Sequence, residues 1–171
     1  DFEMSFATQE DVFKVIEEVV PYTFERFTNW KVDKGPFVRI PYKEAMEKYG
    51  IDKPDLRNPL IIQDVTTLFE NSDFNAFKGK TVKAIVVPDG AKQGRKFFDK
   101  MGDFATTDEV GAKGLAWTKF EETGEVTGGI AKFITKEIKE KLEKEFGVEK
   151  NSAIFFIADE FEKAQKIAGL V

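Results

Sequence analysis

The sequence has 171 residues, enough for one large domain or a small domain with an attached segment, and its 42% of hydrophobic residues permit a substantial core. It contains no cysteine and no histidine, which excludes disulfides, thiolate nucleophiles, imidazole metal ligands and catalysis by a histidine base. The net charge of −5 gives no general attraction to nucleic acid, although a local basic patch remains possible. No apolar run approaches the ~18 residues of a transmembrane helix, so we expect no membrane span.

Two elements are expected near the N-terminus. Apolar and polar residues alternate from Phe2 to Phe6, which predicts a strand with one buried face. Thr8 to Asp11 is typical of a helix start, with a hydroxyl cap and acidic groups in the first turn. Apolar residues then recur every three or four positions as far as Phe27, so this helix is expected to bury one stripe. Pro21 removes an amide donor and is expected to kink or divide it.

A shorter helix is predicted from Tyr42 to Tyr49, ended by Gly50 in a left-handed conformation. Two prolines, Pro54 and Pro59, follow within a few residues and indicate a loop or linker. We therefore expect a domain boundary near residue 59. Because the chain starts with Asp1 rather than Met and has no charged-then-apolar leader, we expect it to be a piece of a longer protein.

From about residue 60 onward the pattern predicts an α+β domain that folds alone. Its sheet is expected to be small, mostly antiparallel and covered by helices on one face. The predicted strands are 74–77, 81–87, 115–120 and 153–158, with a hairpin turn at 121–124. The predicted helices are 64–69, 95–101 (resumed at 104–110 after a break at Gly102), 135–146 and 160–168.

Neither glycine-rich site fits a phosphate-binding loop. Gly128-Gly129 and Asp89-Gly90 are most simply turns, and both the P-loop and the GxGxxG patterns are absent. Three acidic residues, Asp159, Glu160 and Glu162, gather near a helix start, where the helix dipole favours anions. Capping is a sufficient explanation for them, so no metal site is predicted.

Four basic residues close in sequence are the candidates for contact with nucleic acid: Lys92, Arg95, Lys96 and Lys100. Phe97 and Phe98 stand among them, and basic groups interleaved with aromatic rings are typical of a nucleic-acid surface. The alternative is that the phenyl rings face the core and the basic groups are solvated. We favour this alternative for the rings, since adjacent phenylalanines on a helix bury well.

Three stretches resemble one enzyme family. Residues 42–59 read YKEAMEKYGIDKPDLRNP, residues 1–6 read DFEMSF, and residues 111–117 read GAKGLAW, with IAKF following at 130–133. These stretches are similar, in family order, to bacterial-type aspartyl-tRNA synthetases of class II. GAKGLAW and IAKF resemble the family's insertion, the GAD domain, which is shared with a glutamyl-tRNA amidotransferase subunit, whereas DFEMSF resembles the strand after the second class II motif.

The resemblance implies that residues 1–59 are a slice of the class II catalytic domain and residues 60–171 the GAD insertion. The parent enzyme would activate L-aspartate with ATP and Mg²⁺ and transfer it to tRNA(Asp), as a cytoplasmic homodimer. Whether it also charges tRNA(Asn) stays open. Because the arginine-bearing part of the second motif, the third motif and the anticodon-binding barrel are missing, the fragment is expected to be inactive, monomeric and without a cofactor.

Asp1 carries over from the family as a substrate residue, since its equivalent contacts the ammonium group of bound aspartate. A fixed carboxylate is a strong acceptor for an ammonium group. Glu3 is expected on the same strand face, either lining the same floor or as a solvated carboxylate. The alternative function is a stand-alone module of the GAD type that binds protein or tRNA, although such a module has no reason to carry the DFEMSF segment.

Overall fold

The computed structural model describes residues 2–171, and the chain divides into two compact units, Asp1–Ile40 and Pro41–Val171. The division falls between residues 40 and 41, and the domain boundary expected near residue 59 stays a prediction. No helix within residues 2–171 is both long and apolar enough to cross a membrane.

In the first unit, helix α1 spans Gln9–Phe27 and begins with reciprocal hydrogen bonds. The Thr8 hydroxyl accepts from the Asp11 amide at 3.4 Å, and the Asp11 carboxylate accepts from the Thr8 amide at 2.9 Å. These bonds satisfy amides that a helix start leaves unpaired, and the Thr8 amide lowers the pKa of the Asp11 carboxyl. The predicted helix start is confirmed, and the helix continues through Pro21 without dividing.

The strand predicted at residues 2–6 is wrong. Residues 2–4 have no regular structure, residues 5 and 6 form a turn, and Phe6 has a left-handed φ of 53°. Phe2 and Met4 are both exposed. A strand is stabilised by hydrogen bonds to neighbouring strands, and no described strand pairs with this segment, so alternation alone does not form one.

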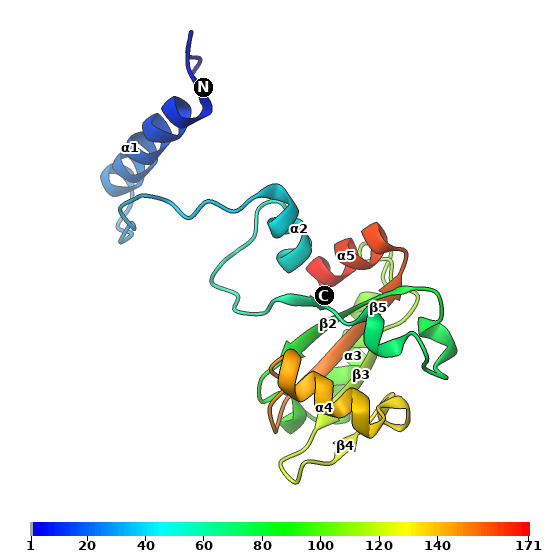
Figure 1. The fold of residues 1–171 in the computed structure, drawn as a ribbon. Helices are drawn as coiled ribbons and strands as arrows, with labels where there is room; N and C mark the ends of the chain where they lie inside the picture. Colours follow the sequence, from blue (N-terminus) through cyan, green and yellow to red (C-terminus); the bar gives the residue numbers. More distant parts are fainter. Residues whose placement is uncertain (1) are drawn as a thin grey trace. The chain divides into compact units, whose positions relative to one another are not determined.

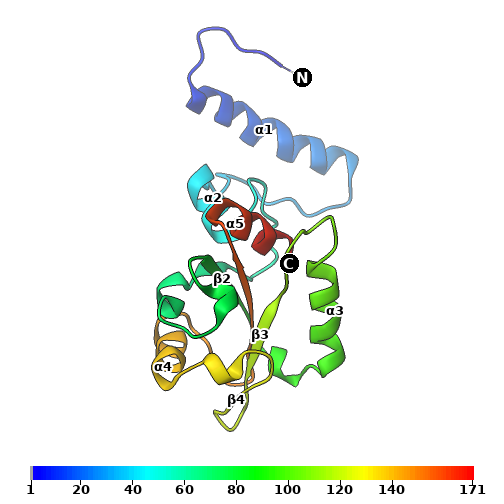
Figure 2. The ribbon, with the colours of Figure 1, turned by 90° about the vertical axis from the view of Figure 1, so that its right-hand side faces the viewer.

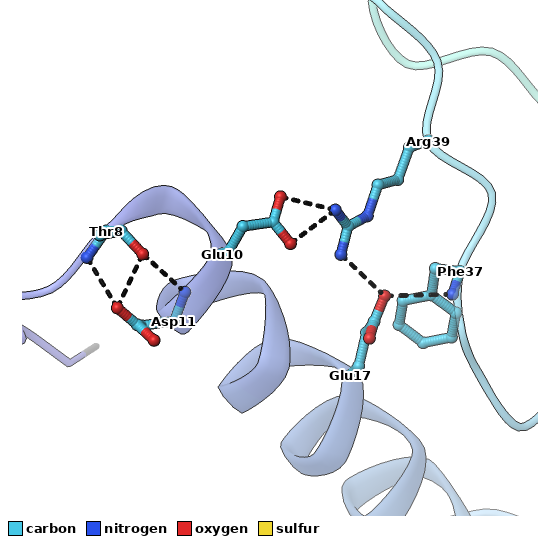
Figure 3. Close-up of polar contacts among 6 residues, drawn as sticks. All are labelled: Thr8, Glu10, Asp11, Glu17, Phe37 and Arg39. Atoms are coloured by element: carbon cyan, nitrogen blue, oxygen red, sulfur yellow. Dashed lines mark hydrogen bonds and ion pairs between the residues drawn. The ribbon is translucent and has the colours of Figure 1, made fainter.

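The segment after α1 is fastened back to that helix (Figure 3). Arg39 donates two hydrogen bonds to the Glu10 carboxylate, at 2.7 and 2.8 Å, and lies 3.8 Å from Glu17. Glu17 also accepts from the Phe37 amide at 3.3 Å. Glu10 and Glu17 are seven residues apart and so lie on one face of the helix. The hydrogen bond to Glu10 raises the pKa of the Arg39 guanidinium.

In the second unit the described strands form an antiparallel sheet in the order β1-β2-β5-β3-β4. The strands are β1 (Ile62–Asp64), β2 (Thr81–Val87), β3 (Ala116–Phe120), β4 (Val126–Thr127) and β5 (Ala153–Asp159). The longest pairing joins β2 and β5, from Thr81 opposite Asp159 to Val87 opposite Ala153. The α+β prediction is confirmed, as is the hairpin that joins β3 to β4.

Helices pack on both sides of this sheet. They are α2 (Tyr42–Tyr49), α3 (Arg95–Ala105), α4 (Lys136–Glu145) and α5 (Phe161–Leu170). Short 3₁₀ helices, η1 (Thr66–Phe69), η2 (Asn75–Phe77), η3 (Gly90–Lys92) and η4 (Ala131–Phe133), join them to the strands. Figures 1 and 2 show α3 and α4 on opposite sides of the sheet.

The side chains of β5 explain why both faces are covered. Ile154 and Phe156 pack in one core with α4, η1 and η2, whereas Phe155 packs against α3 and Ile157 against α5. The expectation of one covered face is therefore wrong. A strand that is apolar at consecutive positions is buried on both sides, and β5 is apolar from Ala153 to Ala158.

Two other local predictions are wrong. Residues 74–77 were expected to form a strand but contain η2, and the ring of Phe77 stands edge-on to Phe69 with 5.0 Å between centroids. Helix α3 runs through Gly102 without the expected break. A side chain at Gly102 would meet nothing within 4 Å, so packing imposes no interruption there.

Candidate functional site

The two acidic residues predicted near the substrate do not form a described site. Asp1 lies outside the described residues, so its role stays a prediction. Glu3 is exposed, and the strand face on which we expected it is not formed in residues 2–6. Asp11 is the nearest carboxylate along the chain with a lowered pKa, and its hydrogen bonds to Thr8 serve the start of α1.

The four candidate residues for nucleic-acid contact lie close together on two consecutive elements, and we call them the basic cluster: Lys92, Arg95, Lys96 and Lys100. Lys92 ends η3, and the other three lie in the first two turns of α3. All four are exposed. Lys96 and Lys100 are four residues apart and therefore lie on one face of α3.

Carboxylates neutralise half of the basic cluster. The Lys92 amine lies 2.5 Å from Asp89 Oδ1, and Arg95 Nε lies 3.7 Å from Asp99 Oδ2. The hydrogen bond to Asp89 raises the pKa of Lys92. Among residues 2–171 no carboxylate lies within 4 Å of the Lys96 or Lys100 amine. The charge that is free to meet an anion is therefore concentrated on these two lysines.

The two phenylalanines of α3 face the core, as favoured from the sequence. Phe98 is 1% exposed and its ring stacks on Trp117 with 4.1 Å between centroids and 23° between planes. Phe97 is half-buried, and the centroid of its ring lies 6.1 Å from that of Phe155. The basic cluster thus presents charge without these rings, so it suits contact with phosphates better than stacking on bases.

A further cation, Lys119 on β3, was not singled out from the sequence. Its amine donates to the carbonyl oxygens of Ala91 and Gln93, at 2.9 and 2.6 Å, and lies 5.0 Å from the centre of the Phe98 ring. Lys119 therefore fastens η3, and with it Lys92, to the sheet. Its carbonyl partners come from residues 26 and 28 positions away, which no local pattern indicates.

Comparison with known proteins identifies the family. The sequence model of the GAD domain matches residues 73–168, more than half of the chain. The chain belongs to the GAD domain family. The match begins just before η2 and ends in α5, so it contains strands β2 to β5 and the whole basic cluster.

Curated proteins similar to this chain include ligases that also match outside the GAD domain. The chain is 49% identical to an aspartate–tRNA(Asp/Asn) ligase of Rickettsia bellii over 176 aligned residues. It is 51% and 50% identical to aspartate–tRNA ligases of Streptomyces avermitilis and Streptomyces coelicolor over 171 residues. Each alignment covers 100% of this chain but 29% of the relative. The chain therefore spans less than a third of the length of these relatives.

Within the GAD domain, Gly128 and Gly129 do more than form a turn. A side chain at Gly128 would overlap the Trp117 ring, and one at Gly129 would overlap the Trp117 carbonyl oxygen. Gly128 also has a left-handed φ of 79°. The loop after β4 can lie directly on Trp117 because both positions lack a side chain. This close approach holds one side of a shallow hollow of about 470 Å³ that Arg95 and Lys119 also line.

The acidic residues near the start of α5 are used within the GAD domain itself. Asp159 is 3% exposed, and its carboxylate accepts from the Glu160 amide at 2.9 Å. It also lies 3.3 Å from the Lys163 amine and 3.9 Å from that of Lys113. The Glu160 amide bond first, and Lys163 after it, lower the pKa of Asp159. A buried carboxylate is stabilised by hydrogen bonds and cations of this kind.

Proposed function

We propose that this chain is part of an aspartate–tRNA ligase, with residues 1–59 from the class II catalytic domain and residues 60–171 forming its GAD insertion. The observation that carries the proposal is the extent of the match to named ligases. The alignments, with 49–51% identity overall, cover the whole chain, including the residues ahead of the GAD match at 73–168. A stand-alone interaction module gives no reason for that similarity in residues 1–72.

The proposed parent enzyme attaches L-aspartate to tRNA(Asp) through an aspartyl-adenylate. The name of the Rickettsia relative gives tRNA(Asp/Asn), whereas the Streptomyces names give only an aspartate–tRNA ligase, and the tRNA that we assign is tRNA(Asp). Asp1 is proposed to accept a hydrogen bond from the ammonium group of aspartate. Such charge-assisted bonds are about twice as strong as neutral ones, which suits a residue that selects an amino acid.

The parent enzyme is proposed to use ATP with Mg²⁺. Residues 2–171 contain no cluster of three or more carboxylates that fits a metal ion. The four residues of the basic cluster on α3 and η3 are exposed. We therefore assign neither ATP nor Mg²⁺ to the described residues, and expect the isolated chain to be inactive and monomeric. The parent itself is proposed to be a cytoplasmic homodimer.

The basic cluster is proposed to contact the tRNA backbone as an accessory surface. Lys96 and Lys100 supply the charge, because Asp89 and Asp99 pair with the other two members. Contacts from exposed lysines to phosphates position a nucleic acid without reading its bases. The chain as a whole carries a charge of −5, so this contact is expected to be weak and sensitive to salt.

A chimera tests the proposed function directly. The segment of the Streptomyces coelicolor ligase that aligns with this chain is replaced by the chain itself, to which it is 50% identical. Aspartate-dependent exchange between ATP and pyrophosphate, and aspartylation of tRNA(Asp), should both be retained. The isolated 171-residue chain should give no exchange above a boiled control. A chimera that folds, by circular dichroism, but has no exchange activity would contradict the proposal.

The same chimera tests Asp1. Asp1→Asn removes the charge from the proposed acceptor, and a charged hydrogen bond is worth about 1.5–3 kcal/mol, so the KM for aspartate should rise about 10- to 150-fold. Glu3→Gln is the matched control and should change this KM by less than about threefold, as expected of a solvated carboxylate. Equal effects of both variants would show that Asp1 has no special role.

The tRNA contact is tested with the isolated chain. Binding to tRNA(Asp) should be absent at micromolar protein in about 150 mM salt and detectable only near about 50 mM. Replacing Lys96 and Lys100 by Glu should abolish it. Replacing Lys136 and Lys150, two exposed lysines elsewhere, is the control and should have little effect. Tight binding that survives about 200 mM salt and ignores Lys96 and Lys100 would favour the stand-alone module instead.

A further inference from the structure

Helix α2 precedes the GAD match, yet it packs on the body of the second unit. It contacts α5 and β1, and Figures 1 and 2 show it beside α5. Ala45 in its middle is 3% exposed, and Gly50 at its end is buried. An eight-residue helix is not stable alone in water, so these contacts are what maintains α2.

Two glycines face each other where α2 meets α5. A side chain at Gly169 would place its Cβ 2.7 Å from the Tyr49 carbonyl oxygen and 2.9 Å from Gly50 Cα. A side chain at Gly50 would place its Cβ 2.7 Å from Gly169 Cα. Real Cβ atoms do not approach so closely, so the two backbones touch here only because both residues are glycine.

A buried side-chain amide fixes the same contact. Gln165 on α5 is 3% exposed, and its Nε2 donates to the carbonyl oxygen of Met46 in the last turn of α2. That carbonyl also accepts from the Gly50 amide at 3.0 Å. A buried amide is costly without a partner, so Gln165 stabilises α2 in this one position along α5.

The loop that follows α2 does not separate it from the sheet. This connector, residues 51–61, is exposed at Ile51, Leu56 and Ile61 and contains both prolines that suggested a linker. Its ends are nevertheless fixed to the same body, since Gly50 contacts α5 and Ile62 pairs with Ile85 in the sheet. Movement of the connector therefore does not change the position of α2 relative to α5 and the sheet.

The chain ahead of α2 is fixed to the other unit. Phe37 and Arg39 are hydrogen bonded to Glu17 and Glu10 of α1 (Figure 3). Pro41 already belongs to the start of α2, because its carbonyl oxygen accepts from the Ala45 amide at 2.9 Å. Little more than the backbone between Arg39 and Pro41 is left without a described hydrogen bond to either unit.

We propose that α2 is a clasp, held by Gly50, Gln165 and Gly169, that makes residues 41–171 one rigid body. Reorientation between the two units is then confined to the backbone between Arg39 and Pro41 and does not occur at the proline-containing connector. This inference is independent of the proposed enzymatic function, because it concerns contacts within the chain. It assigns a structural role to residues 42–50, which lie outside the GAD match.

Hydrogen exchange on the 171-residue chain tests the clasp with a matched pair of variants. Gly169 and Gly102 both lie inside helices with right-handed φ, but a Cβ at Gly102 meets nothing within 4 Å. Gly169→Ala should lower the protection of α2 amides about tenfold or more and leave β2 and β5 within about twofold. Gly102→Ala should leave α2 unchanged. Gln165→Leu, which keeps the size but removes the donor, should also lower protection in α2.

Unprotected α2 amides in the unaltered chain, or an equal loss in α2 and the sheet on Gly169→Ala, would overturn the clasp. The position at which the two units reorient is tested by ¹⁵N relaxation. Amides of α2 should share the tumbling time of β2 and β5, whereas those of α1 should differ. Two glycines inserted between Ile40 and Pro41 should increase that difference, and the same insertion between Asp55 and Leu56 should not release α2. A single tumbling time for all helices, or α2 following α1, would overturn the proposal.

Discussion

The two units of this chain have similar fractions of hydrophobic residues but bury them differently. In the first unit large apolar side chains such as Phe27, Trp30 and Val38 are 69–77% exposed. Apart from Pro21, the first buried hydrophobic residue in the described chain is Ala45. The second unit, in contrast, buries three clusters of apolar side chains around its sheet.

This difference between the units shows which secondary structure forms from local hydrogen bonds and which requires hydrogen bonds from other strands. Helix α1 forms in the first unit because its hydrogen bonds and its Thr8 cap are internal to the segment. The strand expected at residues 2–6 does not form, because its hydrogen bonds would have to come from other strands. Exposed phenyl rings in such a segment are typical of a surface that contacts another part of a protein.

The largest expected effect is a difference in the free energy of unfolding between two variants, one with a substitution in each unit. Leu142 on α4 is 0% exposed in the core, so Leu142→Ala should lower the free energy of unfolding by about 2–5 kcal/mol. Phe27→Ala removes a larger side chain, but one that is 77% exposed, and should cost less than about 0.5 kcal/mol. Urea titration measures both. Similar losses for the two variants would mean that the first unit also has a core.

The pH dependence of stability sharpens the same contrast. The pKa of Asp159 is lowered in the folded chain, by the Glu160 amide and then by Lys163, so its stabilisation is complete above the unfolded value of about 3.9. It is lost as the pH falls through the folded pKa. Asp159→Asn should cost about 1.5–3 kcal/mol at pH 7, and this difference should shrink toward pH 3.

Asp11 provides the control in the first unit. Its pKa is also lowered, by the Thr8 amide, but the groups that it contacts belong to the exposed start of α1. Asp11→Asn should leave the urea transition of the core unchanged at both pH values. A cost of Asp159→Asn that is the same at pH 3 and pH 7 would show that lost packing, rather than charge, explains its effect.

A smaller effect is expected from the two threonine caps. Thr135 accepts from the Ile138 amide at 3.3 Å and Thr8 from the Asp11 amide at 3.4 Å, so the caps are chemically alike. Thr135→Ala should lower the free energy of unfolding by about 0.5–2 kcal/mol. Thr8→Ala should reduce helical circular dichroism without moving the urea midpoint. A shifted midpoint for Thr8→Ala would couple α1 to the core.

The elements predicted correctly from the sequence are those with local signals. Thr8 and Thr135 cap their helices, Gly50 ends α2 and Gly147 follows α4, both with left-handed φ, as their positions indicate. The predictions that were wrong concern residues whose structure depends on distant partners. Residues 2–6 lack a neighbouring strand, and residues 74–77 lie where the aromatic core favours a 3₁₀ turn.

The features of the candidate site also differ in whether local sequence predicts them. The basic cluster and the inward-facing Phe98 follow from residues that are adjacent in the sequence. Lys119 holds a turn about 26 residues away, and Gly50 meets Gly169 across more than a hundred residues. Such contacts follow from the topology of the sheet, and a single sequence read by local pattern does not contain them.

The smallest expected effect is the removal of the first unit. Residues 41–171 alone should unfold with the same free energy as the whole chain, within about 0.5 kcal/mol, because the first unit contributes no buried hydrophobic residue except Pro21. Removing residues 41–59 as well should lower the free energy further, by about 1 kcal/mol or more, since Ala45 and the α2–α5 contact are lost. Urea titration of the three lengths compares them. Equal stability of 41–171 and 60–171 would mean that α2 adds nothing to the core, and a loss already at 41–171 would mean that the first unit is not independent of it.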